Sequence, residues 1–358
     1  MNIPNTIMTR LVAGKPVLVA EAGVNYYDIA KKLGIALIDA AKLMIKEAKE
    51  AGIHAIKFQS YKASELAAKI SPSYWDLNEN PVTSQRELFS FFDHFGAKEY
   101  TELAQYATDI GIEFLSTAFD REAADYLNPL MNVYKISSSD LSNIPFIEYQ
   151  ARKNKPMLIS IGASEETEID LALETIRAVN NQPIVILHCV LEYPTPLQDA
   201  NLRKIVSLKE KYKDCYIGYS DHTKPTLDCD VAKVAYALGA RLIEKHYTLD
   251  KTLPGNDHFH SMDSEDAKRI LDSLNRVEML CGDGSLICLN GETCSRRNAR
   301  RSLVSACKIP AGSTITAAML KEKRPGTGIS PQNAAALIGR VAAVDIDEDI
   351  TLQYSMFA

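Results

Sequence analysis

Short apolar runs alternate with amphipathic segments along most of the chain, and this alternation constrains the fold more than any other feature. Eight runs have the length and composition of buried strands: 17–23, 55–60, 113–118, 133–138, 156–162, 184–189, 215–220 and 241–246. Segments with helical periodicity follow most of them, for example 31–51, 98–110, 165–180, 225–239 and 263–280. Eight such units predict an α/β fold of the (β/α)8 TIM-barrel type. The main alternative is an open doubly wound sheet, but "EAGVNYYD" lacks the glycine-rich phosphate turn typical of that fold.

The pattern changes after residue 281. Residues 282–297 are rich in glycine and polar side chains and are interpreted as a linker. From residue 298 onward, short β segments alternate with tight turns such as "IPAG" and "DEDI". We therefore expect a catalytic barrel over 1–281, a linker over 282–297 and a small, mostly β domain over 298–358. A domain of about 60 residues has a small core and is only marginally stable alone, so we expect it to pack on another surface.

Composition limits the possible partners and compartments. The net charge is −6 and the pI about 5.7, with no long basic run, which argues against nucleic acid or an anionic membrane as main partner. No run approaches a membrane span of about 18 apolar residues, and the start lacks the pattern of a signal peptide. Seven cysteines, an odd number without a CxxC motif, are typical of reduced thiols. We expect a cytoplasmic protein.

Polar residues gather at the carboxyl ends of the predicted strands. They are Glu21, Lys57, Gln59, Ser116, Thr117, Lys135, Ser138, His188, Ser220, Asp221, His222 and His246. Any one of them has an ordinary structural explanation, such as a rim lysine paired with a carboxylate or a hydrogen-bonded core histidine. Together they are hard to explain by packing, because unpaired buried charges are costly and all these strand ends meet at one mouth of a barrel. The pattern favours an active site there.

Two kinds of chemistry are indicated at this mouth. His222 and His246 end adjacent strands, and two imidazoles with open positions suit a divalent ion that also takes substrate oxygens. His258 and His260 fall further along the chain in an expected loop and are disfavoured as ligands, whereas nearby Asp257 is a candidate for contact with a polar substrate. Lys57, Lys135 and Ser138 suggest a phosphate or carboxylate ligand. The pocket is therefore predicted to take an anionic small molecule beside a metal.

Several ordered motifs resemble a known family. "AEAGVN", "IKFQ", "YKISS", "HCVLEYPTP", "IGYSDHT", "LGARLIEKHYTLDK" and "PGNDH" resemble the sialic acid synthases, that is, the N-acetylneuraminate synthases and their bacterial nonulosonic acid relatives. The tail "KRPGTGISP" resembles their C-terminal SAF (antifreeze-like) domain. The similarity extends over residues 16–355, which is nearly the whole chain.

The resemblance implies a reaction in which phosphoenolpyruvate condenses with an N-acylated amino-sugar aldehyde, such as N-acetylmannosamine, and phosphate is released. It implies Glu21 as the catalytic carboxylate, assisted by Lys57 and Lys135. It implies a divalent cofactor on His222 and His246, with Mn²⁺ the first choice and Mg²⁺ or Co²⁺ as alternatives. The residues implied for phosphoenolpyruvate are Lys57, Thr117, Lys135, Ser138, Tyr193 and Ser220. Those implied for the sugar are Gln59, Asp140, Asp257 and Arg324, the last reaching over from a neighbouring subunit in a domain-swapped homodimer.

Departures from the family pattern lie near the expected sugar pocket. "SSSD" (137–140) stands where "GSGE" is usual, so Asp140 replaces a glutamate. Leu191 and Glu192 stand where a small polar residue is common, and "GVNYYD" replaces the usual turn after Glu21. These differences leave the aldehyde open. The alternatives are a legionaminic or pseudaminic acid synthase, another phosphoenolpyruvate-dependent aldol-type enzyme on the same barrel, and a non-catalytic sugar-binding relative.

Overall fold

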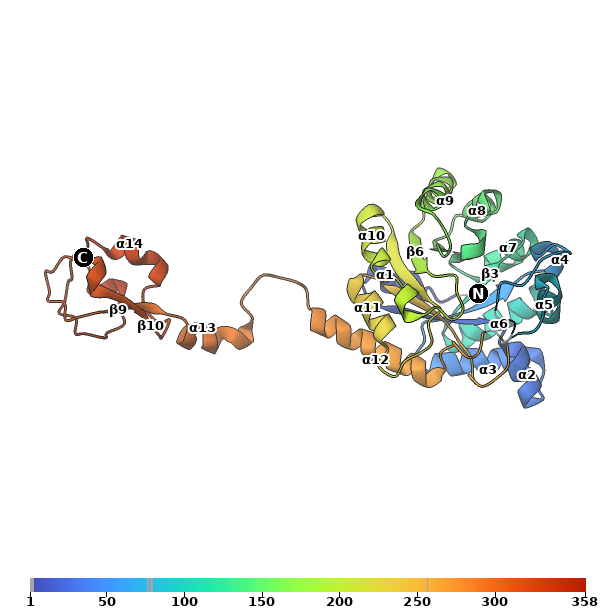
Figure 1. The fold of residues 1–358 in the computed structure, drawn as a ribbon, viewed down its shortest axis with the longest axis horizontal. Helices are drawn as coiled ribbons and strands as arrows, with labels where there is room; N and C mark the ends of the chain where they lie inside the picture. Colours follow the sequence, from blue (N-terminus) through green and yellow to red (C-terminus); the bar gives the residue numbers. More distant parts are fainter. Residues whose placement is uncertain (1–2, 76, 78–79, 256) are drawn as a thin grey trace. The chain divides into compact units, whose positions relative to one another are not determined.

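The computed structural model describes residues 3–75, 77, 80–255 and 257–358. Its chain divides into two compact units, Met1–Gly282 and Asp283–Ala358, each with its own core (Figure 1). No helix in the described part of the chain is long and apolar enough to cross a membrane.

The first unit is built around eight strands. They are β1 Val17–Gly23, β2 Ala55–Ser60, β3 Glu113–Ala118, β4 Tyr134–Ile136, β5 Met157–Ser160, β6 Ile184–Cys189, β7 Tyr216–Asp221 and β8 Leu242–His246. The strand order is β3-β2-β1-β8-β7-β6-β5-β4, and every hydrogen-bonded pair is parallel. The end strands β3 and β4 lie against each other, so the sheet closes. The predicted (β/α)8 barrel is confirmed.

Helices surround the strands of the first unit. They are α1 Thr6–Val12, α2 Tyr26–Leu33, α3 Leu37–Glu50, α4 Ala63–Leu66, α5 Gln85–Phe92, α6 Ala97–Ile110, α7 Arg121–Leu127, α8 Ile144–Ala151, α9 Glu166–Val179, α10 Lys204–Lys211, α11 Asp230–Leu238 and α12 Ser264–Cys281. Three 3₁₀ turns lie between them, η1 Asn128–Leu130, η2 Ser138–Asp140 and η3 Leu197–Asp199. The segment 31–51, predicted as one helix, is two, because Gly34 adopts φ +66° and ends α2 in the left-handed region.

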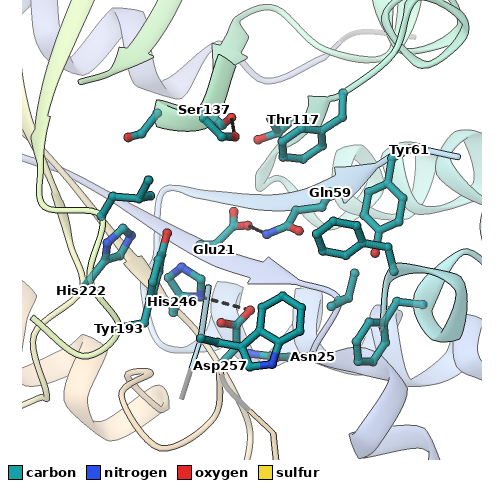
Figure 2. Close-up of a pocket in the computed structure, with 18 of the residues that line it drawn as sticks. Glu21, Asn25, Gln59, Tyr61, Thr117, Ser137, Tyr193, His222, His246 and Asp257 are labelled. Carbon is teal, nitrogen blue, oxygen red and sulfur yellow. Dashed lines mark hydrogen bonds and ion pairs between the residues drawn. The ribbon is translucent and has the colours of Figure 1, made fainter. Parts of the chain in front are cut away.

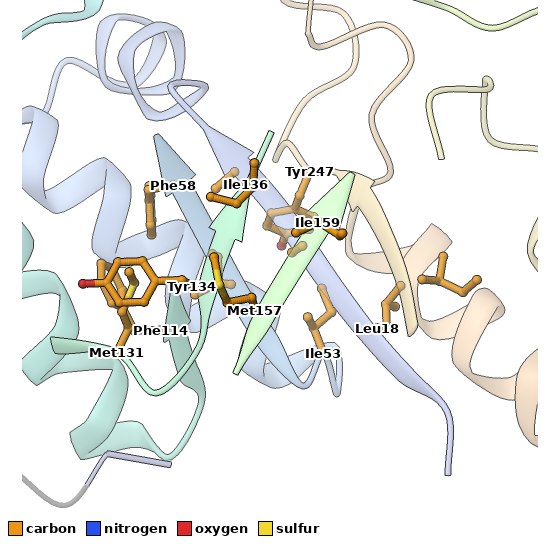
Figure 3. Packing of buried hydrophobic residues seen from close by; sticks show 14 of the residues in the cluster. Leu18, Ile53, Phe58, Phe114, Met131, Tyr134, Ile136, Met157, Ile159 and Tyr247 are labelled. Carbon is orange, nitrogen blue, oxygen red and sulfur yellow. The ribbon is translucent and has the colours of Figure 1, made fainter. Parts of the chain in front are cut away.

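Side chains of each strand alternate between two apolar layers. One set faces the helices and forms the larger core, which includes Leu18, Phe58, Phe114, Tyr134 and Met157 (Figure 3). The other set fills the barrel interior, with Val17, Val19, Ala55, Leu115, Val133, Leu158, Val185, Leu187 and Leu242. Towards the carboxyl ends of the strands, the inward positions change from apolar to polar. Polar side chains therefore line the mouth of the barrel, while the apolar layers below it stay packed.

The second unit is small and carries little regular structure. Its elements are η4 Asn290–Glu292, α13 Thr293–Ala299, β9 Ser302–Ser305, η5 Ala317–Met319, β10 Leu320–Lys323, η6 Pro331–Asn333, α14 Ala334–Leu337 and η7 Tyr354–Met356. Strands β9 and β10 pair antiparallel, and isolated bridges extend the β structure, as predicted for the tail. The core contains Leu303, Ile309, Ile315, Ile329, Leu337, Ala342, Ile346, Leu352 and Phe357. Part of the segment interpreted as a linker is helical, since η4 and α13 lie there.

Candidate active site

A cavity of about 440 Å³ lies at the carboxyl ends of the barrel strands (Figure 2). Its lining includes the residues of the first unit that the family resemblance implied, namely Glu21, Lys57, Gln59, Thr117, Lys135, Ser138, Asp140, Tyr193, Ser220, His222, His246 and Asp257. Arg324 follows β10 in the second unit. Residues from all eight strands or the loops that follow them therefore meet in one cavity.

Other polar residues near the strand ends point away from the cavity. His188 donates from Nε2 to the carbonyl of Ala200 at 2.8 Å, and Asp221 pairs with Lys245 at 2.8 Å. Ser116 exchanges a hydrogen bond with Ser60 at 2.6 Å. All three occupy strand positions that face the helices, so the sequence-based grouping of these residues with the active site is wrong.

Four buried charges lie at the floor of the cavity. Lys57 pairs with Glu21, and its Nζ lies 3.6 Å from Oε1 of Glu244. Lys135 Nζ lies 3.5 Å from the same Glu244 oxygen, and Ser220 donates to that oxygen at 3.2 Å. Glu244, in the middle of β8, was not among the predicted residues. It places one carboxylate between two lysines, which keeps both cations buried and paired.

The pKa values in this cluster diverge. Burial raises the pKa of Glu21, with Glu244 adding to the rise and Lys57 opposing it. Burial would also raise the pKa of Glu244, but Lys135 and Lys57 outweigh it and lower the value to about 2. Burial lowers the pKa of Lys135 against the attraction of Glu244. Glu244 is therefore the fixed anion of the cluster, and Glu21 is the carboxyl group better suited to exchange a proton.

Neighbouring polar groups hold these side chains in place. Gln59 donates to Glu21 Oε1 at 2.8 Å (Figure 2), and Lys57 donates to Thr117 Oγ1 at 3.2 Å. The backbone N–H of Gly162 donates to the hydroxyl of Ser138 at 2.9 Å. An alanine at Gly162 would bring its Cβ within 2.8 Å of that hydroxyl, so the loops after β4 and β5 meet as closely as the chain allows.

Two imidazoles lie edge to face beside Tyr193. The rings of His222 and His246 are 5.3 Å apart, and Tyr193 lies 4.2 Å from His222. His222 Nδ1 lies 2.7 Å from the carbonyl of Val190; because a carbonyl only accepts, Nδ1 carries the proton and Nε2 keeps its lone pair. Nδ1 of buried His246 has no hydrogen-bond partner among the described residues, and burial lowers the pKa of this ring well below its usual value. An available nitrogen on each ring fits a divalent ion.

The part of the loop after β8 that carries His258 and His260 is buried at these two residues, whereas the sequence suggested an exposed loop. It folds back over the strand end, with Met262 donating to His246 and Thr248 to Met262. His258 contacts Thr248 Oγ1 at 2.8 Å and Asp28 Oδ2 at 3.3 Å, so both of its nitrogens have partners. The fully buried His260 lies 4.9 Å from His246, ring to ring.

One wall of the cavity is apolar and was not foreseen from the sequence. The segment between β2 and α6 contributes Leu66, Tyr74, Trp75, Leu88, Phe89 and Phe92 to the lining. The cavity therefore combines a charged floor with an aromatic side. Such a cavity suits a ligand that carries both an anionic group and apolar substituents.

Comparison with known proteins shows which family the chain resembles. A family model described as the NeuB family matches residues 44–286, and a SAF domain model matches residues 300–358. The N,N'-diacetyllegionaminic acid synthase of Legionella pneumophila is 33% identical over 342 residues, which cover 94% of this chain and 92% of that protein. The N-acetylneuraminate-9-phosphate synthase of Mus musculus is 33% identical over 353 residues, covering 96% and 93%.

A solved structure extends the similarity to the fold. The crystal structure of an N-acetylneuraminic acid (sialic acid) synthetase from Leptospira borgpetersenii, in complex with citrate, matches with a TM-score of 0.68 and 31% identity. The match covers 78% of this chain and 90% of that one. The family resemblance seen in the sequence is confirmed. Because the family model spans more than half of the chain and the relatives match nearly all of it, the chain belongs to the NeuB family of sialic and legionaminic acid synthases and carries a C-terminal SAF domain.

Proposed function

We propose that this enzyme condenses phosphoenolpyruvate with an N-acylated amino-sugar aldehyde and releases phosphate by C–O cleavage. The observation that carries the proposal is the pair of buried lysines, Lys57 and Lys135, which share Glu244 next to two available imidazoles. Two cations at 3.5 and 3.6 Å from one carboxylate oxygen can each turn towards an incoming anion. Thr117, Ser138, Tyr193 and Ser220 line the same cavity and would complete the phosphoenolpyruvate site.

The residues divide the reaction between them. C3 of phosphoenolpyruvate attacks the aldehyde carbon, a water oxygen adds to C2, and the bond from C2 to the bridging oxygen then breaks to release phosphate. Glu21, whose pKa is raised by burial, would position that water and take its proton. Lys57 and Lys135 would stabilise the charge on the departing phosphate. A divalent ion on His222 and His246, with Mn²⁺ the first choice and Mg²⁺ or Co²⁺ as alternatives, would supply polarisation of the aldehyde oxygen.

The sugar would occupy the side of the cavity that faces the aromatic wall. Gln59, Asp140 and Asp257 line the cavity and would bind the hydroxyl groups of the sugar. Arg324 would reach the acyl group from the SAF domain of a second subunit, in a domain-swapped homodimer acting in the cytoplasm. The second candidate substrate is a 6-deoxy diacylamino sugar of the legionaminic or pseudaminic type. The apolar wall formed by Tyr74, Trp75 and Phe92 favours it, because extra methyl groups gain from burial there.

Phosphate release with a panel of aldehydes tests this function. We expect release only when both phosphoenolpyruvate and a suitable aldehyde are present, and near-complete loss in a Lys135→Met variant. Lys98→Met, at an exposed position on α6, is the matched control and should keep full activity. Binding of the sugar without phosphate release would instead identify a non-catalytic relative.

A further inference from the structure

His260 is the least expected residue near the cavity. Its side chain is fully buried, and neither ring nitrogen has a hydrogen-bond partner among the described residues. It does not line the cavity; it lies next to His246, with ring centroids 4.9 Å apart. Leaving a buried donor or acceptor unpaired costs roughly 1–3 kcal/mol for each group. Two such nitrogens on one ring, beside a third on His246, indicate that the position serves a ligand.

A carboxylate completes this group. Asp257 Oδ2 lies 3.6 Å from Nδ1 of His246, too far for a hydrogen bond (Figure 2). One ligand atom from each of His246, Asp257 and His260 lies within 4.8 Å of the other two. A neutral imidazole carries one N–H and one lone pair, so His260 can offer one ring nitrogen to a metal ion. The set has the composition of a divalent-cation site.

We propose that Asp257 and His260 join His246 as ligands of the divalent ion that the proposed function assigns to His222 and His246. This inference rests on the metal dependence of the proposed function. It also moves Asp257 from sugar binding to the ion. An ion among these three side chains would bind one nitrogen of each ring, so two of the three unpaired nitrogens would gain a partner.

The kind of ligand atom determines which metal ion the site prefers. Imidazole nitrogen suits Co²⁺, Zn²⁺ or Fe²⁺, whereas Mg²⁺ prefers oxygen ligands and keeps much of its water. A third imidazole nitrogen should therefore strengthen binding of Co²⁺ much more than binding of Mg²⁺. His260 would act as the residue that shifts this chain towards transition metals.

Titration of the metal-free full chain with Co²⁺ tests the site directly. The protein is stripped with a chelator and dialysed, and Co²⁺ is followed by visible absorption and by bound-metal content, with neither phosphoenolpyruvate nor aldehyde present. We expect one Co²⁺ per chain, and a His260→Phe variant should bind it roughly 10- to 100-fold more weakly, the range found when a supporting residue of a metal site is removed. Mg²⁺ binding should be weak in both proteins.

Two histidine variants serve as controls that separate loss of a metal ligand from general disruption of the protein. His258→Phe alters the same loop, but both nitrogens of His258 already have partners, so Co²⁺ affinity should change little. His94→Ala removes an exposed imidazole and reports on adventitious surface binding. In chelator, His260→Phe should unfold at the same temperature as the wild type or higher, and added Co²⁺ should stabilise it much less than the wild type.

The outcomes distinguish this inference from the proposed function. Unchanged Co²⁺ affinity in His260→Phe, or an equal loss in His258→Phe, would overturn the site while leaving the reaction in place. Absence of phosphate release with every aldehyde would overturn the reaction, but a His260-dependent Co²⁺ site measured without substrates would still stand.

Discussion

The direction of a single side chain decides its chemistry in this barrel. On β8, Leu242 faces the barrel interior, so Glu244 and His246 face the same way, and Lys245 between them faces the helices and pairs with Asp221. The same period of two puts Lys57 and Gln59 inside on β2. If this alternation had been applied to every predicted strand, the sequence would have placed Glu244 in the active site and His188 and Asp221 outside it.

Glu244→Gln should destabilise the fold. The change removes the carboxylate shared by two buried lysines and leaves Lys135 without a close anion, since Glu21 pairs with Lys57. Breaking a buried ion pair typically costs roughly 3–5 kcal/mol. Denaturant unfolding should show a loss of this size, and inorganic phosphate should restore part of it by acting as a replacement anion. An unchanged unfolding midpoint would contradict the assignment of Glu244 as the structural anion.

Asp140→Glu should change the choice of aldehyde. Asp140 lies in η2 at the cavity, where Ser137 donates to its Oδ2 at 3.3 Å. An added methylene advances the carboxylate by about 1.5 Å, the length of a C–C bond. The ranking of kcat/KM between N-acetylmannosamine and a 6-deoxy diacylamino analogue should therefore shift. If the ranking stays the same, Asp140 has no part in specificity.

At the scale of elements, α1 closes the amino end of the barrel. Ile7, Met8 and Leu11 pack with the residues that fill the barrel interior. The backbone N–H of Ile7 donates to Oε2 of Glu113, the first residue of β3, at 2.7 Å. Glu113 is fully buried, and burial raises the pKa of its carboxyl group to about 7. This end of the barrel serves stability, as is typical of the fold.

Glu113 should make stability depend on pH. Its pKa is about 7 in the fold against 4.5 as reference, so the folded state favours the protonated form. The stability it contributes is complete below pH 4.5 and is lost as the pH rises through about 7, a change of roughly 3 kcal/mol. Glu113→Gln keeps an acceptor for Ile7 without titrating. Between about pH 5 and pH 8.5 the wild type should therefore lose unfolding free energy relative to the Glu113→Gln variant. A difference in unfolding free energy that does not change with pH would refute this.

The strands of the barrel were predictable because each is a short apolar run bounded by polar segments, and all eight predicted strands overlap an observed one. The break between α2 and α3 was missed, since it depends on one left-handed glycine, Gly34, within a continuous amphipathic pattern. The polar mouth was partly predictable from strand ends. The burial of His260 was not, because it follows from the return of a loop over β8 that no local pattern encodes.

At the scale of the whole molecule, the chain joins a barrel to a small SAF unit. The barrel provides the cavity residues described above, whereas Arg324 belongs to the other unit. The core of the SAF unit is small, and a domain of this size is marginally stable alone. This supports the proposal that a second chain takes part in the working enzyme.

Complementation between two inactive variants tests that proposal. Glu21→Ala and Arg324→Ala should each be nearly inactive. In a reciprocal twofold dimer, a mixed pair has one site with both changes and one with neither, so random mixing should restore roughly a quarter of all sites. Co-expression of the two variants, with activity measured per site, provides the readout. Failure to recover activity would place Arg324 in its own barrel's site or outside the site altogether.

The central claim is that this chain joins phosphoenolpyruvate to an amino-sugar aldehyde with C–O cleavage. The most direct measurement uses phosphoenolpyruvate labelled with ¹⁸O at the bridging oxygen, incubated with the enzyme, a divalent ion and the aldehyde panel, and analyses both products by mass spectrometry. The account predicts a nine-carbon keto acid without label and phosphate that carries it. Label retained in the sugar acid, or phosphate released without any condensed product, would contradict the account.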